Sequence, residues 1–469
     1  MYLLYSLLLV IWGLALLPVF LYKALRYGKR MSGIGQRFGR LPENLRADRA
    51  AHAGCSDCSD CGKRAVIWFH SCSVGETLSL EPLTRELRRR LPDARFIFST
   101  VTQTGHEVAV RSFGAENVFY FPVDFAFVIR RVLDWIRPSL IVIIDTEIWL
   151  NLLRLAPRRN IPVALANGRI SPDSFRYYRL ARPALRHVFR NYAALMMQSE
   201  EDARRITALG APTEIISTPG NMKFDGGFSQ KASREELRRD LSENFLRDAA
   251  DDDASPAPLI VAGSTHPDEE SILFEVLREL RRVPDLAKTR LVVAPRHPER
   301  FDAVADIAGA FGFAVRRRSQ SGAENKVNEA NKVNEANKVN APVLLLDTIG
   351  ELAEIYCFAD IVFVGGTLVR YGGHSILEPA AFSKAIVIGT HMENFRAVRN
   401  EFAARGALRQ ITATEADRHL QKKQLLEVFQ ELLQNIEERE ALGRAARAVI
   451  EENRGAAERI ADKLLGIIK

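Results

Sequence analysis

This sequence has few cysteines, no strong excess of one charge and none of the common nucleotide fingerprints. Five cysteines in 469 residues are too few for a disulfide scaffold, so a reducing compartment is expected. Lys and Arg total 65 against 58 for Asp and Glu. This mild excess suits an anionic membrane surface or a phosphorylated substrate and is too diffuse to indicate nucleic acid. Neither G-x-G-x-x-G nor G-x-x-x-x-G-K-[ST] occurs, so NAD and Walker-type ATP sites lack support, and no cofactor or metal is expected.

Charged residues are also absent from positions 1–22. This apolar run can cross a hydrocarbon core of roughly 30 Å, and it lacks the basic start and cleavage site of a signal peptide. The basic residues that follow are Lys23, Arg26, Lys29, Arg30, Arg37, Arg40, Arg46 and Arg49, against only Glu43 and Asp48. By the positive-inside rule, residues 1–22 are predicted to be a single transmembrane anchor, with 23–64 a basic arm and the remainder cytoplasmic. The alternative is a buried helix of a soluble protein, which usually carries a polar stripe.

Apolar runs of strand length alternate with amphipathic helical segments from Ala65 onward. The first series predicts strands at 65–70, 95–100, 140–145, 162–167 and 194–199, with helices at 76–91, 104–113 and 125–136. The second series predicts strands at 258–264, 289–295, 343–348, 360–366 and 385–390, with helices at 269–282 and 299–311. Such alternation is typical of parallel sheets covered on both faces. The predicted fold class is therefore α/β, with two Rossmann-like domains.

The domain boundaries follow from these two series. The predicted domains are 65–225 and 258–414, joined by a charged linker at 226–257 and followed by helices at 415–469 that can pack across both halves. Two insertions receive no role: a six-residue repeat within 319–340, typical of a solvated loop, and a loop at 47–63. That second loop holds Cys55, Cys58 and Cys61, spaced like part of an iron–sulfur ligand set. A fourth ligand is missing nearby, so redox-silent cysteines are preferred; an iron–sulfur protein would be coloured and contain iron.

Polar residues gather where strands of the first series end. The segment HSCSVGE (70–76) passes from strand to helix and places Glu76 in the first helical turn. In an open α/β sheet the ligand crevice lies at this edge, yet a carboxylate in a first turn also stabilises the helix dipole. Spacing alone leaves both interpretations open. Asp145, Glu147 and Asn151 follow the third strand, where acidic residues are more often ligand groups than core residues.

Candidate anion-binding residues lie at the join of the halves and in the second series. Lys223 can neutralise a phosphate or carboxylate there, or be an ordinary surface lysine. Arg296 follows a predicted strand and is placed either for a phosphate or for a surface ion pair. Glu378 comes early in the helix after Gly372 and Gly373, where a carboxylate can accept hydrogen bonds from ribose hydroxyls. Together with glycines that let backbone N–H groups approach an anion, these residues favour a nucleotide-sugar site.

Nine segments, in this order after one N-terminal anchor, resemble 3-deoxy-D-manno-octulosonic acid (Kdo) transferases. They are HSCSVGE (70–76), TVTQTG (100–105), DTEIWLN (145–151), NGRIS (167–171), QSEEDARR (198–205), GNMKFD (220–225), GSTHPDEE (263–270), APRHPER (294–300) and GGHSILEPA (372–380). The resemblance covers about residues 66–396. It implies a GT-B glycosyltransferase, its two Rossmann-like domains facing a central cleft, on the cytoplasmic face of the inner membrane. Such enzymes transfer Kdo from CMP-Kdo to a lipid A precursor (lipid IVA) in lipopolysaccharide core biosynthesis, releasing CMP.

The resemblance also implies roles for individual residues. Glu76 matches the catalytic base, which would deprotonate the acceptor hydroxyl of the glucosamine disaccharide, and Glu147 and Lys223 match positions that assist the transition state. The positions that match CMP-contacting segments are Pro295, Arg296, Ile349, Gly350, Glu351, Ser375, Ile376, Leu377 and Glu378. Two positions depart from the family pattern: Ser375 replaces the usual Asn, which puts one CMP contact in doubt, and Leu150 replaces the usual Pro.

Two other functions compete with this interpretation. A different membrane-associated GT-B transferase would use a UDP-sugar, and competition between CMP and UDP would distinguish it. A membrane-tethered nucleotide-binding protein would show no transfer with authentic donor and acceptor. The joint presence of Glu76, Lys223 and Arg296 in matching motifs argues against a protein without catalysis.

Overall fold

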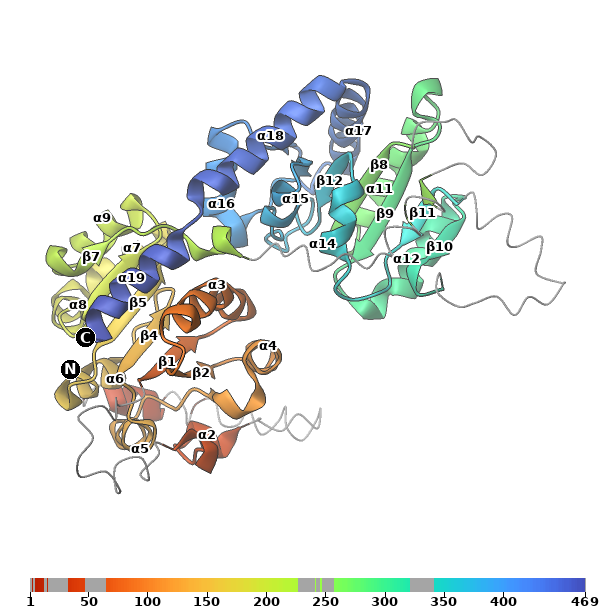
Figure 1. The fold of residues 1–469 in the computed structure, drawn as a ribbon. Helices are drawn as coiled ribbons and strands as arrows, with labels where there is room; N and C mark the ends of the chain where they lie inside the picture. Colours follow the sequence, from red (N-terminus) through yellow and green to blue (C-terminus); the bar gives the residue numbers. More distant parts are fainter. Residues whose placement is uncertain are drawn as a thin grey trace. The chain divides into compact units, whose positions relative to one another are not determined.

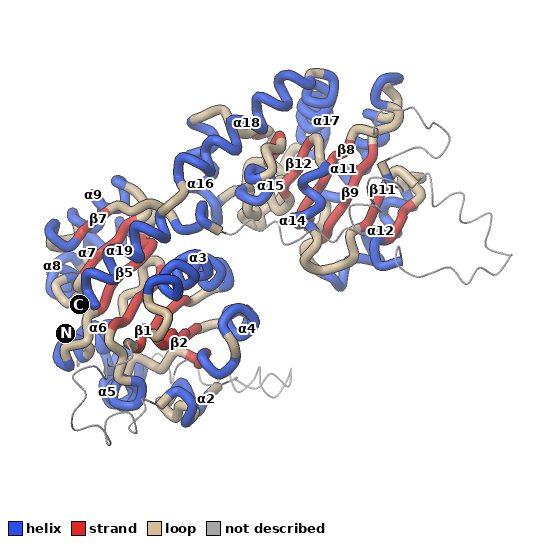
Figure 2. Tube along the Cα trace, viewed as in Figure 1, coloured by secondary structure: helices blue, strands red, loops and turns tan. Residues whose placement is uncertain are grey.

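The chain folds into two units, each built around its own sheet. The computed structural model describes residues 2, 5–11, 15, 33–46, 65–226, 241, 245–246, 257–320 and 341–468 (Figures 1 and 2). The first unit comprises Met1–Gly227 and Asn453–Lys469, and the second comprises Phe228–Glu452. The chain therefore leaves the first unit once and returns to it at its end.

The first unit contains a seven-stranded parallel sheet in the order β3-β2-β1-β4-β5-β6-β7. Its strands are β1 (Val66–Ser71), β2 (Arg95–Thr100), β3 (Val118–Tyr120), β4 (Leu140–Ile144), β5 (Val163–Gly168), β6 (Ala194–Met197) and β7 (Ile216–Ser217). The five strands predicted from apolar runs are confirmed. β3 and β7 were not predicted, because two or three residues do not make a recognisable apolar run. The strand order reverses direction between β1 and β4.

Helices cover both faces of this sheet. They are α2 (Ile34–Arg37), α3 (Val74–Arg90), α4 (Gln103–Phe113), α5 (Ala126–Ile136), α6 (Leu150–Leu155), α7 (Pro172–Leu180), α8 (Arg182–Phe189), α9 (Glu200–Ala208) and α19 (Ala456–Ile468). Alternation along β1 sends Trp68 to the core shared with α5, α6 and α8, and sends Ile67 and Phe69 to the core shared with α3, α4 and α19. All three side chains are buried, so β1 is apolar on both faces, as a central parallel strand must be.

The second unit repeats this plan with a parallel sheet in the order β10-β11-β9-β8-β12-β13-β14. Its strands are β8 (Leu259–Thr265), β9 (Arg290–Pro295), β10 (Val315–Arg317), β11 (Val343–Leu345), β12 (Ile361–Val364), β13 (Ala385–Ile388) and β14 (Arg409–Gln410). Its helices are α11 (Glu269–Leu280), α12 (Phe301–Ala310), α14 (Leu352–Ile355), α15 (Leu377–Ala381), α16 (Arg396–Ala404), α17 (Arg418–Gln434) and α18 (Ile436–Asn453). One apolar core joins the sheet to α11, α12 and α17. The prediction of two α/β halves is confirmed, and the order of this sheet reverses between β8 and β12.

The last helix belongs to the first unit. α19 packs against α3 and against the short 3-10 helix η6 (Met222–Asp225). Asp225 holds the start of α19, because its two carboxylate oxygens accept hydrogen bonds from the N–H groups of Gly455 and Ala457, each at 2.6 Å. The sequence predicts helices at 415–469 that can pack across both halves. In the structure α17 and nearly all of α18 lie in the second unit, and α19 lies in the first.

The start of the chain is described only at residues 2, 5–11 and 15. Residues 5–11 are helical, and Ser6 Oγ accepts a hydrogen bond from the side-chain amide of Asn151 in α6 at 3.3 Å. Within the described ranges, no helix combines the length and the apolar composition that crossing a membrane requires. The predicted anchor at 1–22, most of the basic arm with its cysteine loop, the linker and the repeat within 319–340 lie largely outside the described residues.

Candidate active site

The predicted carboxylates of the first unit come from the two loops at which its strand order reverses. β1 and β4 are neighbours in the sheet, and the segments that follow them begin at its carboxyl edge. In open α/β sheets this reversal point is where ligands bind, because the two loops turn away from each other and leave a crevice. Glu76 follows β1 and Glu147 follows β4, so the topology accounts for their proximity.

Glu76 occupies the first turn of α3, where Ser73 caps the helix. The Ser73 hydroxyl donates to Glu76 Oε1 at 2.7 Å, and Glu76 Oε2 accepts from the Cys72 N–H at 2.6 Å. These contacts confirm that the carboxylate stabilises the helix start, one of the two interpretations that the sequence leaves open. The carboxylate still has acceptor capacity for a substrate proton, because an ionised carboxylate offers about four lone-pair sites.

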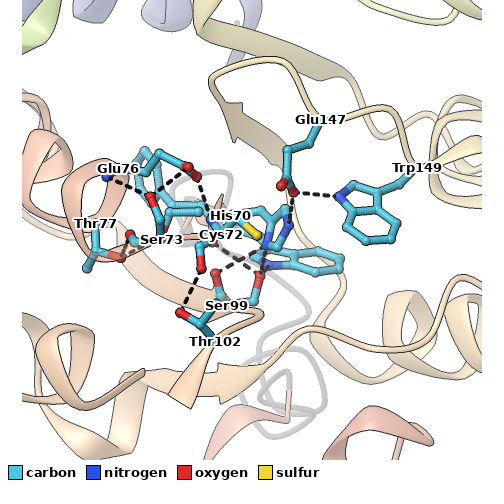
Figure 3. Close-up of polar contacts among 12 residues, drawn as sticks. His70, Cys72, Ser73, Glu76, Thr77, Ser99, Thr102, Glu147 and Trp149 are labelled. Carbon is cyan, nitrogen blue, oxygen red and sulfur yellow. Dashed lines mark hydrogen bonds and ion pairs between the residues drawn. The ribbon is translucent and has the colours of Figure 1, made fainter. Parts of the chain in front are cut away.

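Glu147 is held from three sides. Its Oε2 atom accepts a hydrogen bond from His70 Nε2 at 2.9 Å and from Trp149 Nε1 at 3.0 Å. The Cys72 thiol donates a further hydrogen bond to the carboxylate. Figure 3 shows Glu76 and Glu147 on either side of Cys72, with Trp149 beyond Glu147. Its donors fix both the position and the orientation of this carboxylate.

His70 holds Glu147 in place, and sequence reasoning did not single it out. Its imidazole is completely buried and stacks on Phe121 with ring centroids 3.9 Å apart. Because a carboxylate can only accept, the hydrogen bond to Glu147 requires a proton on His70 Nε2. His70 Nδ1 lies 2.9 Å from the Ser99 hydroxyl and 3.2 Å from the Ser99 carbonyl, so both ring nitrogens are held in place. The available signal was position, since His70 is a polar residue at the end of an otherwise apolar strand.

Asp145 interacts electrostatically with both Glu76 and the predicted lysine, Lys223. It adopts a left-handed φ of 57°, which is uncommon outside glycine, and its Oδ1 atom accepts from the side-chain amides of Asn167 (3.0 Å) and Gln198 (3.2 Å). Asn167 Oδ1 in turn accepts from the Met222 N–H at 3.0 Å, which ties Asp145 to the 3-10 helix that carries Lys223. Burial raises the pKa of Asp145, and the positive charge of Lys223 opposes that rise. Lys223 therefore lies within electrostatic reach of this acidic group.

The two predicted glutamates have pKa values shifted in opposite directions. Burial raises the pKa of Glu76, and the negative charges of Asp145 and Glu147 add to this effect against the lowering by its own hydrogen bonds. Burial also opposes ionisation of Glu147, but the hydrogen bonds from His70, Cys72 and Trp149 outweigh burial and lower its pKa. Pairs of carboxylates that are pushed apart in this way commonly divide the roles of proton acceptor and permanent negative charge.

A polar cavity of about 260 Å³ opens beside Asp145. Its lining residues are Asp145, Thr146, Arg169, Ser171, Ser174 and Tyr178. Burial, followed by the negative charge of Glu147, raises the pKa of Tyr178, so this wall of the cavity is within electrostatic reach of the glutamate. Hydroxyl groups, one carboxylate and one guanidinium around a small volume suit a hydroxylated ligand such as a sugar.

The second sheet places two histidines at its own reversal point. His266 follows β8 and His374 lies in the loop after β12, and their Nε2 atoms are 2.9 Å apart. One ring must donate and the other accept, so both cannot be charged at once. Burial and neighbouring positive groups, Arg296 among them, lower the pKa of each to about 4. The Arg296 guanidinium itself is exposed and makes no hydrogen bond or ion pair with any described residue, which leaves it available to a phosphate.

Glu269, the first residue of α11, holds the glycine-rich loop after β12. Its Oε2 atom accepts from the N–H groups of His266 (2.9 Å) and Gly366 (2.8 Å), and Oε1 accepts from those of Thr367 and Leu368, both at 3.0 Å. The side chain is fully buried. Four backbone donors on one carboxylate fix the loop that carries His374, a role that the sequence motif GSTHPDEE did not reveal.

The predicted CMP-contacting residues of the loop after β11 differ in whether their side chains can reach a ligand. Ile349 is 79% exposed, and Gly350 has a φ of 91° that favours glycine. The Glu351 carboxylate is buried and accepts from the Arg318 guanidinium at 3.2 and 3.4 Å and from the Thr348 hydroxyl. A ligand at this loop therefore meets the Ile349 side chain and backbone atoms, whereas the Glu351 carboxylate is already engaged.

The remaining predicted donor residues lie at the same strand edge. Pro295 ends β9, and Ser375 Oγ accepts from the Leu377 N–H at 3.4 Å just before α15. Ile376 and Leu377 are buried, so only their backbone atoms can reach a ligand. Burial raises the pKa of Glu378, and its carboxylate makes no hydrogen bond with the described residues. Glu378 is thus free to accept hydrogen bonds from a bound ligand.

Comparison with known proteins gives consistent matches. Residues 32–226 match the family model described as 3-deoxy-D-manno-octulosonic-acid transferase (kdotransferase). The chain is 34% identical to a 3-deoxy-D-manno-octulosonic acid transferase of Haemophilus influenzae, over 85% of this chain and 86% of that protein. It is 31% identical to the transferase of the same name from Bordetella pertussis, over 85% of this chain and 87% of that protein.

A solved structure shares the architecture at low sequence identity. The UDP-GlcNAc 2-epimerase of Neisseria meningitidis, bound to UDP-GlcNAc, matches with a TM-score of 0.54 and 13% identity, covering 86% of this chain and all of that one. At this identity the match shows the fold alone, which is GT-B-like with two parallel seven-stranded sheets.

Proposed function

The chain belongs to the 3-deoxy-D-manno-octulosonic acid (Kdo) transferase family, and we propose from this premise that it transfers Kdo from CMP-Kdo to a lipid A precursor and releases CMP. The observation that carries the proposal is the pair of oppositely shifted glutamates at the β1–β4 edge, in a chain 34% identical to a named Kdo transferase over most of its length. Such a pair can provide a base for the acceptor hydroxyl and a permanent negative charge beside it.

The proposed reaction is a direct displacement at the anomeric carbon of Kdo. Glu76 removes the proton from the acceptor hydroxyl as the oxygen attacks, the new C–O bond forms, and the bond to the CMP phosphate breaks with its electron pair leaving on the phosphate. A positioned base of this kind contributes roughly 10²–10⁴-fold to a rate. The raised pKa of Glu76 makes it a stronger base than an ordinary glutamate, because burial and, after it, repulsion from Asp145 and Glu147 favour the protonated carboxyl.

Glu147 and Lys223 are proposed to assist the transition state rather than take the proton. The donors around Glu147 keep it ionised, so it can stabilise positive charge that develops on the sugar as the phosphate departs. Lys223 offsets the negative charge of Asp145 and can meet an anionic group of a substrate. The cavity beside Asp145 is the proposed place for acceptor sugar hydroxyls.

The second unit is proposed to hold the CMP part of the donor. Arg296 would bind the phosphate, the backbone of the loop at 349–351 and the residue Ser375 would contact the nucleotide, and Glu378 would accept from the ribose hydroxyls. The exposure of the Arg296 guanidinium supports its role, and so does the Glu378 carboxylate, which makes no hydrogen bond with the described residues. Ser375 is shorter than the Asn usual in the family, so its contact with CMP requires a closer approach of the nucleotide or a bridging water.

Nucleotide competition on the full chain tests this donor assignment against a UDP-sugar transferase. Calorimetric titration is expected to show saturable binding of CMP and markedly weaker binding of UDP, because the carbonyl that uracil carries cannot replace the amino group of cytosine as a donor. Tighter binding of UDP would favour the UDP-sugar alternative. Binding of CMP without any transfer from CMP-Kdo would favour the non-catalytic alternative.

We further propose that residues 1–22 anchor the chain in the inner membrane, with both units on the cytoplasmic face. Their apolar length and the basic residues that follow support this orientation. Crossing the membrane requires Ser6 to leave its contact with Asn151. Membranes from cells that produce the full chain should retain it during alkaline carbonate extraction, and deletion of residues 1–22 should move it to the soluble fraction. Release of the full chain by carbonate would contradict a membrane-crossing anchor.

A further inference from the structure

A basic pocket on the outer face of α5 is separate from the residues of the candidate active site. It has a volume of about 510 Å³ and is lined by Arg46, Arg130, Arg131, Arg137, Phe127 and Trp135, with Asp134 as the one acidic residue of its lining. None of these residues takes part in the proposed transfer. Four guanidinium groups around one cavity point to an anionic ligand.

The pocket residues on α5 form a surface stripe that the fold does not need for its core. Positions 127, 130, 131 and 134 follow the spacing that places residues on one face of a helix, and all four are exposed. The opposite face, which includes Val128, Ile129 and Val132, is buried in the core of the first unit. The exposed arginines can therefore be replaced without removing any apolar packing.

The positive charge of the pocket is not cancelled within it. Asp134 is engaged by Arg159, with Nε–Oδ1 at 3.0 Å and Nη2–Oδ2 at 3.3 Å. The guanidinium groups of Arg130, Arg131 and Arg137 make no hydrogen bond or ion pair with any residue that the structure describes. An arriving anion therefore gains hydrogen bonds from these three groups without breaking existing ones.

Aromatic side chains give the same pocket an apolar part. Trp135 is fixed in place because its indole N–H donates to the Pro42 carbonyl at 3.2 Å and the Arg46 guanidinium lies 4.9 Å from the ring centroid. Phe127 is 67% exposed at the other end of the stripe. An exposed aromatic ring beside arginines is typical of surfaces that lie at the membrane interface.

We propose that this pocket binds the phosphate headgroup of an anionic phospholipid, with Phe127 entering the acyl boundary. A lipid is favoured over a soluble anion because the apolar and cationic groups are exposed together, and because Arg46 belongs to the segment that follows the apolar residues 1–22. The residues between 22 and 33 can span at most about 40 Å, which keeps the pocket within reach of the surface at which that run would enter. The inference does not depend on Kdo transfer.

Fluorescence of Trp135 offers a readout at the pocket itself, which is needed because residues 1–22 can bind any bilayer. The full chain is mixed with phosphatidylcholine vesicles that contain brominated phosphatidylglycerol, and quenching is compared with that of Trp135→Phe. We expect a quenched component that Trp135→Phe lacks and that added salt reduces. Three interfacial arginines together should change the partition coefficient of the chain between water and the vesicle surface on the order of 100-fold. The variant R130Q/R131Q/R137Q should therefore lose most of the Trp135 quenching.

The matched control is R111Q/R204Q, which removes exposed arginines of α4 and α9 that do not line the pocket. It should behave as wild type, and circular dichroism should show all variants folded. Three results would each overturn the inference. These are unchanged quenching in the triple variant, equal quenching by brominated phosphatidylcholine, and binding of soluble glycerol phosphate as tight as binding to the anionic vesicles, which would assign the pocket to a soluble anion.

Discussion

Glu76→Gln is expected to lower the rate of Kdo transfer by about 10²–10⁴-fold while leaving CMP binding unchanged. The amide cannot accept the proton of the acceptor hydroxyl, but it keeps the size of the side chain and one oxygen for the cap formed with Ser73 and Cys72. Steady-state transfer from CMP-Kdo to a lipid A precursor measures the effect on turnover.

Glu86→Gln is the matched control for this variant. Glu86 lies in the same helix, and its carboxylate pairs with Arg89 and Arg90 on the surface. Turnover of Glu86→Gln should equal that of wild type. If Glu76→Gln also kept near-wild-type turnover, the carboxylate would be only a helix cap and another group would have to be the base.

The pH dependence of transfer also tests whether Glu76 is the catalytic base. Because only ionised Glu76 can accept a proton, the rate should fall as the pH drops through a pKa that burial, Asp145 and Glu147 raise above the usual glutamate value. Asp145→Asn removes one of the two negative neighbours and should move this acid limb to lower pH. An acid limb that does not move in Asp145→Asn would contradict the electrostatic coupling.

Glu269→Ala is expected to destabilise the second unit by about 3–5 kcal/mol. The substitution leaves four backbone N–H groups without an acceptor, and each unsatisfied buried donor costs about 1–3 kcal/mol, less where water can enter. The loop that carries His374 should lose its fixed shape, and CMP binding should weaken in parallel.

The two units can be followed separately in this experiment. All four tryptophans, at positions 12, 68, 135 and 149, belong to the first unit, so their fluorescence reports that unit alone. Urea unfolding of the first unit should be unchanged, while hydrogen exchange in β12 should accelerate. Glu279→Ala, on the surface of the same helix, should change stability by less than about 0.5 kcal/mol. Equal exchange in Glu269→Ala and Glu279→Ala would show that the loop does not depend on this carboxylate.

The sequence predicts the fold class and the larger elements because the central strands of a parallel sheet are buried on both faces. Such strands appear in the sequence as continuous apolar runs. It misses the short strands β3, β7, β10 and β14, whose lengths of two or three residues leave no pattern, and it predicts helices at 415–469 without specifying that the last of them returns to the first unit. That return depends on Asp225, whose two hydrogen bonds to the start of α19 join residues more than 200 positions apart.

The candidate site is predicted only in part, because the sequence marks residues at strand ends but not the long-range contacts between them. Glu76 and Glu147 stand at strand ends, where position alone makes a carboxylate a candidate. The hydrogen bond that holds Glu147 comes from His70, 77 positions earlier, and no local pattern encodes such a pairing. Glu351 shows the opposite case, because a residue in a matching segment proves to be engaged by Arg318 in the protein interior.

Mass spectrometry of the acceptor tests the central claim most directly. The full chain, incubated with CMP-Kdo and a lipid A precursor, should release CMP and yield an acceptor heavier by whole Kdo units. A folded chain that binds CMP but leaves the mass of the acceptor unchanged, under conditions in which a related Kdo transferase modifies it, would contradict the account.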